Sequence, residues 1–380
     1  MTFRPRRRWR WLGGSLVLLL LLGLTGIWLG PRIEAALVLA DMAAGTGDSL
    51  YKQLTLYPRR SSLRYILDGR MHVADIYRPA DGRALAGIVL VPGVQPLGKD
   101  EPRLVALAMT LARARFTVLV PDIPGMRRLT VHASDVSAIA DTCRWLAEHR
   151  DLAPGGRLGV GAVSYAVAPA VLAAMHPDVG SHVRFVLGIG GYYDLVQLLT
   201  YVTTGFYQVD GQWRHMHPNR YGMWVFALSN VALLAAARDR TILTEMARRK
   251  MADVNANVDD LAAGLGSGGR ALYALLTNTD RQRVPALIAS LPPAMRRLIS
   301  DLTLAGKPLG RLRAKLILVH GRSDTIIPYT QSVELAKAVV PEQAQLFLLD
   351  GFGHASLKHL SLTDRLRLWR AVNLLLAERN

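Results

Sequence analysis

Short apolar runs alternate with helix-like segments along most of this chain, and that alternation limits what the chain can fold into. The apolar runs have the length of strands and lie at residues 84–93, 116–125, 157–163, 182–191, 314–321 and 344–350. Helical patterns follow them at residues 102–115, 134–150, 164–175, 332–340 and 363–378. Strands that are apolar throughout are typical of a parallel sheet covered on both faces. We therefore predict an α/β fold with a mostly parallel sheet and helices on both faces.

The alternation stops between residues 196 and 313, where the pattern is almost entirely helical. We interpret this stretch as a helical cap inserted into one sheet domain, whose two parts are residues 58–195 and 314–380. The first part contains two strand-like segments joined at Asp68-Gly69, a dipeptide that favours the tight turn of an antiparallel pair. The predicted organisation is therefore one large domain with an insertion.

One segment of the predicted cap, residues 221–237, carries no charge and resembles a membrane span. It is slightly short for a span and contains Ser229 and Asn230. A crossing here would also put the chain before and after it on opposite sides of a membrane. We interpret it as a buried cap helix beside an apolar pocket, with a surface that dips into lipid as the alternative.

The N-terminus combines a basic cluster with a long apolar segment. Five arginines fall within residues 1–10, and residues 11–30 carry no charge. Twenty apolar residues at about 1.5 Å each match a hydrocarbon core of about 30 Å. We predict a single transmembrane anchor in the inner (plasma) membrane, with residues 1–10 in the cytoplasm, a juxtamembrane linker over residues 31–57 that begins with a short helix, and the rest of the chain on the outer, periplasmic side. A secretory signal cleaved after residues 38–40 is the alternative.

Charge and residue types exclude several other classes. The net charge is +17 but is spread along the chain, without a basic helix interleaved with aromatic residues, so we expect no nucleic-acid partner. The single cysteine, Cys143, leaves no disulfide framework or cysteine cluster. His215 and His217 are close in sequence but have no nearby carboxylates, so we expect no metal site. The glycine-rich residues 264–269 follow a helical pattern instead of a strand, and we expect no cofactor.

Three residues of complementary chemistry each follow a predicted strand. Ser164, Asp324 and His354 come in that order along the chain. A serine hydroxyl is a weak nucleophile that needs a base beside it, and an imidazole base needs a carboxylate to orient it. Each residue alone has an ordinary explanation, as a helix cap, a turn residue or a loop histidine. Their joint occurrence at three strand ends favours Ser164 as nucleophile, His354 as base and Asp324 as its partner.

From about residue 60 onwards the chain resembles the α/β-hydrolases. The matching segments are VLVPG (89–93), FTVLVPDIPG (116–125), GVGAVSYA (159–166), LVHGRSDTIIP (318–328) and DGFGHASL (350–357). The resemblance implies an α/β-hydrolase fold and a Ser164–His354–Asp324 triad, and the hairpin before residue 89 more weakly resembles the subset related to dienelactone hydrolases and prolyl oligopeptidases.

Two positions depart from the family pattern. The family's G-x-S-x-G turn is here Ala162-Val163-Ser164-Tyr165-Ala166, in which alanine adds only a methyl group. The usual His-Gly after the third strand is Pro92-Gly93. By position, the resemblance implies an oxyanion hole made by the backbone N–H groups of Val94, or alternatively Gln95, and Tyr165.

These observations predict a membrane-anchored serine hydrolase that cleaves carboxylic esters, with a small-molecule or lipid-like substrate and an apolar acyl group. A peptidase or an acyltransferase using the same three residues is an alternative, because the cap selects the leaving group and the acceptor. A non-catalytic lipid- or partner-binding protein on the same fold is a third.

Overall fold

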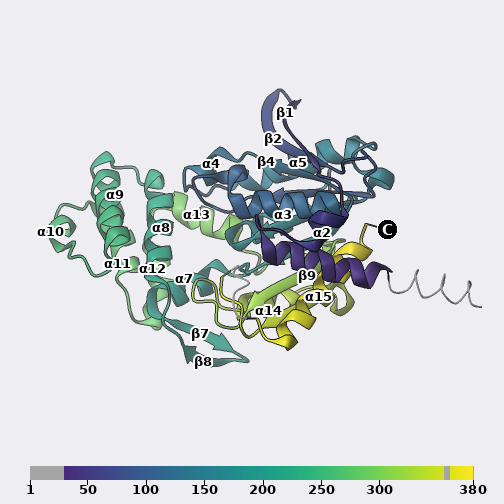
Figure 1. Cartoon of the computed structure of the whole chain (residues 1–380). Helices are drawn as coiled ribbons and strands as arrows, with labels where there is room; N and C mark the ends of the chain where they lie inside the picture. Colours follow the sequence, from purple (N-terminus) through teal and green to yellow (C-terminus); the bar gives the residue numbers. More distant parts are fainter. Residues whose placement is uncertain (1–29, 355–359, 380) are drawn as a thin grey trace, which may run out of the picture.

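The computed structural model describes residues 30–354 and 360–379, and its centre is an eight-stranded sheet (Figure 1). The strand order is β1-β2-β4-β3-β5-β6-β9-β10. From β4 to β10 each strand runs parallel to its neighbours, whereas β2 pairs antiparallel with both β1 and β4. The strands are β1 Arg59–Leu67, β2 Arg70–Arg78, β3 Ala86–Val91, β4 Phe116–Pro121, β5 Leu158–Val163, β6 Val183–Ile189, β9 Lys315–Gly321 and β10 Ala344–Leu349. The predicted, mostly parallel sheet is confirmed.

The predicted antiparallel pair is the β1–β2 hairpin at one edge of this sheet. Asp68 and Gly69 have φ angles of 48° and 74°, so both residues of the two-residue turn are in the left-handed region. A turn of that kind matches the twist of the strands on either side. The hairpin extends the sheet without adding to its parallel part.

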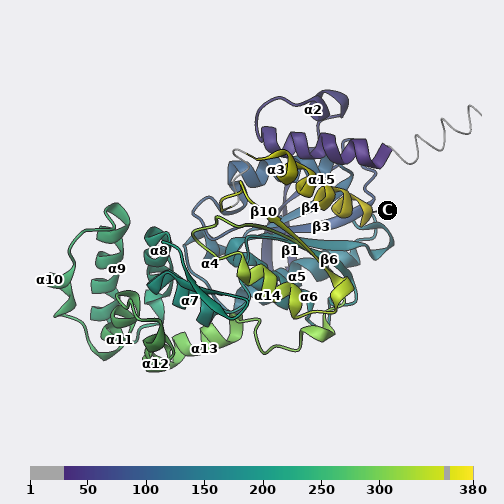
Figure 2. The ribbon, with the colours of Figure 1, turned by 90° about the horizontal axis from the view of Figure 1, so that it is seen from below.

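Helices cover both faces of the sheet (Figure 2). Those of the sheet domain are α2 Leu50–Leu54, α3 Pro102–Arg113, α4 Pro124–Arg127, α5 Ser134–Glu148, α6 Val167–Ala174, α14 Thr330–Lys337 and α15 Leu362–Ala377. Short 3-10 turns are η1 Gly98–Asp100, η2 Pro154–Gly156, η3 Ser164–Ala166, η4 Val231–Leu233, η5 Arg281–Arg283, η6 Leu309–Arg311 and η7 Pro341–Gln343. Alternate strand residues point to opposite faces, so Ile88 packs with α3 and α15 while Val89 packs with α5 and α6. Two hydrophobic cores result, one on each face.

The chain entering the sheet domain is packed against it. Residues 30–44 are helical, and Ala35 and Val38 are fully buried. The indole N–H of Trp369 in α15 donates to the Arg32 carbonyl oxygen at 2.9 Å, and the Thr110 hydroxyl in α3 donates to Asp41 at 2.6 Å. The short helix expected at the start of the linker is therefore present, and because one side of it is apolar it packs into a hydrophobic core of the sheet domain.

The predicted membrane segment, residues 11–30, lies outside the described residues except for Gly30. Among residues 30–354 and 360–379, no helix has both the length and the apolar character that a membrane crossing requires. The uncharged segment at 221–237 does not form one continuous helix. Helix α8 ends at Asn230, η4 follows, and the chain is extended at Leu234 before the next helix.

Between β6 and β9 the chain forms the cap, which stands beside the sheet domain (Figure 1). Its helices are α7 Leu195–Thr204, α8 Arg220–Asn230, α9 Ala237–Ala252, α10 Asp259–Ala262, α11 Ser267–Leu276, α12 Val284–Ser290 and α13 Pro293–Leu302. It also contains a hairpin, β7 Phe206–Val209 with β8 Gln212–His215. The prediction of an almost entirely helical cap is wrong there, because Asp210-Gly211 forms the same left-handed turn as Asp68-Gly69.

Candidate active site

Ser164 lies at a sharp turn where β5 meets a helix. Its φ of 58° is in the left-handed region, which costs a residue with a side chain about 1–2 kcal/mol. β5 ends at Val163 and the 3-10 turn begins at Ser164 itself, so the direction changes within one residue. Ala162 and Ala166 on either side are fully buried, so their small side chains are enclosed by the neighbouring elements. A turn of this kind presents its hydroxyl at the carboxyl edge of the sheet.

His354 joins Ser164 to Asp324 through its two ring nitrogens. Nε2 lies 2.9 Å from Ser164 Oγ, and Nδ1 lies 2.7 Å from Asp324 Oδ2. An ionised carboxylate only accepts, so the Nδ1 proton points to Asp324 and Nε2 is left to accept the hydroxyl proton of Ser164. This is the arrangement in which an imidazole can deprotonate a serine that attacks a carbonyl carbon. The structure thus brings together the three residues predicted to react.

Asp324 is held as a charged group inside the protein. Its side chain is 1% exposed, and burial alone would raise its pKa. Hydrogen bonds with His320 and His354 outweigh burial and hold the pKa of Asp324 well below its usual value. Its second oxygen accepts from the backbone N–H groups of Ile326 and Ile327, at 2.8 and 3.1 Å. The carboxylate therefore stays ionised and fixed in orientation beside His354.

His320, at the end of β9, was not among the predicted site residues. It is fully buried, and its Nε2 lies 2.9 Å from the Ile327 carbonyl oxygen and 3.5 Å from Asp324 Oδ2. A carbonyl oxygen only accepts, so Nε2 carries a proton, while Nδ1 meets the Ser332 hydroxyl at 2.7 Å. His320 thereby supports the loop that carries Asp324. Its place four residues before Asp324, in an otherwise apolar strand, was the available signal.

Val94, Gln95 and Tyr165 line the same cavity as Ser164. That their backbone N–H groups stabilise an oxyanion stays a prediction. The Tyr165 hydroxyl donates to Asp135 at 3.1 Å, and the same carboxylate accepts from the backbone N–H of His132 at 2.9 Å. Burial raises the pKa of Asp135 despite these two bonds. Asp135 thus holds the Tyr165 side chain and the backbone of His132 in position.

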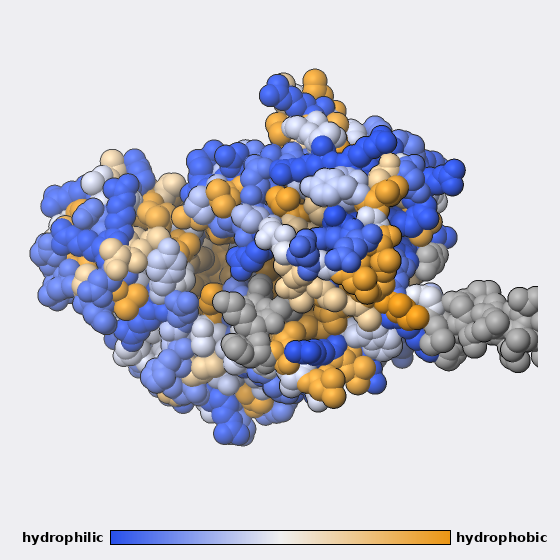
Figure 3. Space-filling view, viewed as in Figure 1, coloured by the Kyte–Doolittle hydropathy of each residue, from blue (hydrophilic) through white to orange (hydrophobic). Residues whose placement is uncertain are grey.

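The Ser164 hydroxyl faces a cavity of about 470 Å³ between the sheet domain and the cap. A hollow is visible there in the space-filling view (Figure 3). Its wall is mostly apolar and comes largely from cap helices, with Leu195, Leu198, Leu199, Val202, Met223, Val225, Phe226, Leu272, Leu275, Met295, Leu298, Ile299 and Leu302 among its residues. No Asp, Glu, Lys or Arg of the described residues is part of it. Volume and lining suit an uncharged chain of several methylene groups.

Solved structures with a similar arrangement include a candidate hydrolase from Legionella pneumophila, with a TM-score of 0.50 and 13% identity over 84% of this chain and 89% of that protein. The Rhodococcus 2-hydroxy-6-oxo-6-phenylhexa-2,4-dienoate hydrolase has a TM-score of 0.45 and 16% identity, over 85% of this chain and 99% of that enzyme. A puromycin-hydrolysing peptidase from Mycobacterium tuberculosis has a TM-score of 0.47 and 13% identity over 85% of this chain, which spans only 38% of the peptidase. No protein-family model and no curated protein sequence matches the chain.

The chain has the α/β-hydrolase fold. In the α/β-hydrolase fold the parallel strands end at one edge, and β5, β9 and β10 here deliver Ser164, Asp324 and His354 to that edge. The end of β6 lies very close to the start of α6. A Cβ added to Gly191, just after β6, would lie 2.4 Å from Val167 Cβ in α6. The tight turn at Ser164 is therefore supported from β6 as well as from its own alanines.

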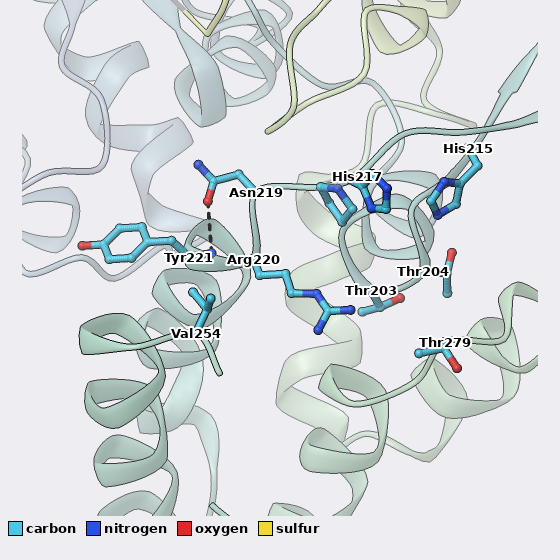
Figure 4. Close-up of a pocket in the computed structure, with 10 residues that line it drawn as sticks. Thr203, Thr204, His215, His217, Asn219, Arg220, Tyr221, Val254 and Thr279 are labelled. Atoms are coloured by element: carbon cyan, nitrogen blue, oxygen red, sulfur yellow. Dashed lines mark hydrogen bonds between the residues drawn. The ribbon is translucent and has the colours of Figure 1, made fainter. Parts of the chain in front are cut away.

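A second, polar pocket of about 340 Å³ lies in the cap (Figure 4). His215 and His217 line it, with ring centroids 5.1 Å apart. Within the described part of the chain, no group of three or more His, Cys, Asp or Glu side chains is arranged to hold a metal ion. Asn219 and Tyr221 belong to both this pocket and the apolar cavity, so the two spaces adjoin.

Proposed function

We propose that this protein is a serine hydrolase that cleaves carboxylic esters with an apolar acyl group. The observation that carries the proposal is the hydrogen-bonded chain Ser164–His354–Asp324 at the wall of an apolar cavity. Ser164 would attack the ester carbonyl carbon while His354 takes its proton, and His354 would then protonate the departing alcohol. Water, activated by His354, would hydrolyse the acyl-enzyme and restore Ser164.

The cavity wall favours esters over peptides. A peptide substrate has a backbone whose N–H and C=O groups need partners when they leave water. Two of the few polar side chains in the wall already donate within α8: the Ser229 hydroxyl to the Val225 carbonyl oxygen, and the Asn230 amide to that of Phe226. An acyl chain has no polar groups that need such partners, and each methylene that it buries contributes about 0.8 kcal/mol to the free energy of binding.

The test is labelling with a fluorophosphonate, which reacts only with an activated serine. We expect stoichiometric labelling of the full-length protein at Ser164, and none in the Ser164→Ala variant. A panel of p-nitrophenyl esters and aminoacyl anilides then separates ester from amide hydrolysis. An unlabelled Ser164 in a folded protein, as judged by circular dichroism, would refute the proposed activity.

We also propose that residues 11–30 anchor the protein in the inner membrane with the catalytic domain on the periplasmic side. The apolar length of that segment and the arginines before it support this orientation. Exposed apolar side chains near the start of the described chain, at Ile33, Leu54, Leu56 and Tyr57, are also compatible with a nearby lipid surface. Two reporter enzymes fused after residue 380 test this topology. A reporter that is active only outside the cytoplasm should be active, and activity of a reporter that works only in the cytoplasm would contradict the proposal.

A further inference from the structure

The polar pocket in the cap differs in charge from the cavity that it adjoins. Ten residues line it, and they include Arg220, His215 and His217 but no Asp or Glu. Figure 4 shows the Arg220 guanidinium directed toward Thr203, with both imidazoles on the same side, while the Tyr221 ring points the other way. The lining therefore holds one permanently charged group, the Arg220 guanidinium, which also lines a neighbouring pocket that contains Lys250 and Asp259.

Arg220 is exposed and has no acidic partner. Among the residues that the structure describes, no carboxylate lies within ion-pair distance of its guanidinium. Arg249 in α9, by contrast, pairs with both Glu245 and Asp260. The fork of N–H donors on Arg220 is thus left available for a ligand.

The other hydrogen-bond donors in the pocket restrict the chemical class of ligand further. The Thr203 and Thr204 hydroxyls already donate to carbonyl oxygens within α7, so they offer only lone pairs. The remaining side-chain donors are Arg220, the two imidazoles, the Thr279 hydroxyl, the Asn219 amide and the Tyr221 hydroxyl, of which the last points away from the Arg220 guanidinium (Figure 4). A cationic fork with several more N–H and O–H groups suits a phosphate-like oxyanion, which presents several acceptor oxygens.

The position of the pocket connects this oxyanion to the proposed substrate. Asn219 and Tyr221, the two residues that flank Arg220, line the apolar cavity as well. The Asn219 backbone N–H donates to the Thr325 carbonyl oxygen at 2.9 Å, directly after Asp324. The start of α8 is therefore fixed to the loop that carries the acid, with the cavity on one side and the polar pocket on the other.

We propose that the polar pocket binds the phosphate-like head group of an amphiphilic ester whose acyl chain occupies the apolar cavity. This inference rests on the proposed ester hydrolysis and specifies its substrate class: a carboxylic ester with one anionic end. The net charge of +17 would also draw anionic substrates toward the protein at low ionic strength.

The first experiment compares two soluble esters of equal chain length, hexanoyl glycerol and hexanoyl glycerol phosphate. We expect wild-type protein to prefer the phosphate ester in kcat/KM, and Arg220→Gln to reduce that preference at least tenfold, since hydrogen bonds to charged groups are the strong ones. Arg297→Gln is the matched control, because Arg297 is an exposed arginine of α13 that lines neither space. An Arg220→Gln protein with the wild-type preference would overturn the inference while leaving ester hydrolysis intact.

The second experiment measures binding without turnover. In the Ser164→Ala background, we expect decyl phosphate to bind at least tenfold more tightly than decanol by isothermal titration calorimetry, and the added Arg220→Gln change to abolish the difference. Inorganic phosphate distinguishes the two sources of the anion. If it binds as tightly as decyl phosphate, the pocket is an anion site unconnected to the acyl cavity, and the head-group inference is wrong.

Discussion

The sheet domain and the cap line the same cavity with different kinds of side chain. Ser164, Asp324 and His354 follow strands of the sheet, and backbone or side-chain hydrogen bonds fix each of them. Most of the apolar wall comes from cap helices, whose residues contribute shape and burial without charge. If the proposed function is correct, the reacting groups and most of the residues that contact the acyl chain belong to separate parts of the molecule. A change in the sheet domain should affect all substrates alike, and a change in the cap should affect some substrates more than others.

The largest effect is expected for His354→Ala. Loss of the base leaves the Ser164 hydroxyl unactivated, so kcat should fall by about 10⁴-fold or more for every ester. Initial rates with p-nitrophenyl acetate and p-nitrophenyl octanoate measure it. A loss that differs strongly between short and long esters would show that His354 also selects the acyl chain, which would break the division between the two regions.

Asp324→Asn should come next, with a fall in kcat of about 10³- to 10⁴-fold. The amide can donate to His354 Nδ1, which then holds its proton on Nε2, the wrong nitrogen for a base. The same two esters serve as substrates, and the ratio of their rates should match that of the wild type. Activity within tenfold of the wild type would contradict the role given to Asp324.

A cap change should act on one class of substrate. Leu198→Trp replaces an isobutyl group in the cavity wall with a larger indole ring and shortens the space for an acyl chain. At about 0.8 kcal/mol per methylene, losing three or four methylene positions lowers kcat/KM for octanoate by about 100-fold, while acetate should change by less than about threefold. Leu287→Trp is the matched control, since Leu287 packs in the cap without lining the cavity. Equal losses for both esters would place Leu198 in the reaction itself.

A smaller effect concerns the turn at Ser164. Its left-handed φ is unfavourable for any residue with a Cβ, so Ser164→Gly should be more stable to urea than Ser164→Ala by about 1 kcal/mol. Both variants lack the hydroxyl and should be inactive, which separates stability from catalysis. Equal unfolding midpoints for the two would mean that the turn is not strained.

The most gradual effect is a pH dependence of stability from Asp324. Its pKa is lower in the folded protein than in the unfolded chain, so the unfolded chain binds the proton more readily. Its contribution to the free energy of unfolding is fully present above the unfolded pKa of about 4 and is lost as the pH falls through the folded value. Urea unfolding of wild type and Asp324→Asn between pH 7 and pH 3 should therefore show the wild type losing stability relative to the variant. A constant difference would contradict the lowered pKa.

The two regions also differ in how far the sequence predicts them. Apolar runs and turn dipeptides indicated the strands that carry Ser164 and Asp324, because buried parallel strands have a strong pattern. The predicted oxyanion donors at Val94 and Tyr165 are backbone groups, which no side-chain type reveals, so that prediction rests on the family resemblance alone. In the cap, the Asp210-Gly211 turn was overlooked among helical patterns. The polar pocket could not be foreseen, since Arg220 and Thr279 are brought together only by helix packing.

The helix over residues 30–44 has a consequence for how the molecule is made. Arg379 pairs with Glu34 and donates to the Ala114 carbonyl oxygen, and Trp369 donates to Arg32. Trp369 lies 337 positions after Arg32 in the sequence, and Arg379 lies 345 positions after Glu34. A ribosome must therefore complete α15 before this helix can acquire the last of its partners. During synthesis, the side of this helix that packs against α15 therefore stays uncovered until α15 has been made.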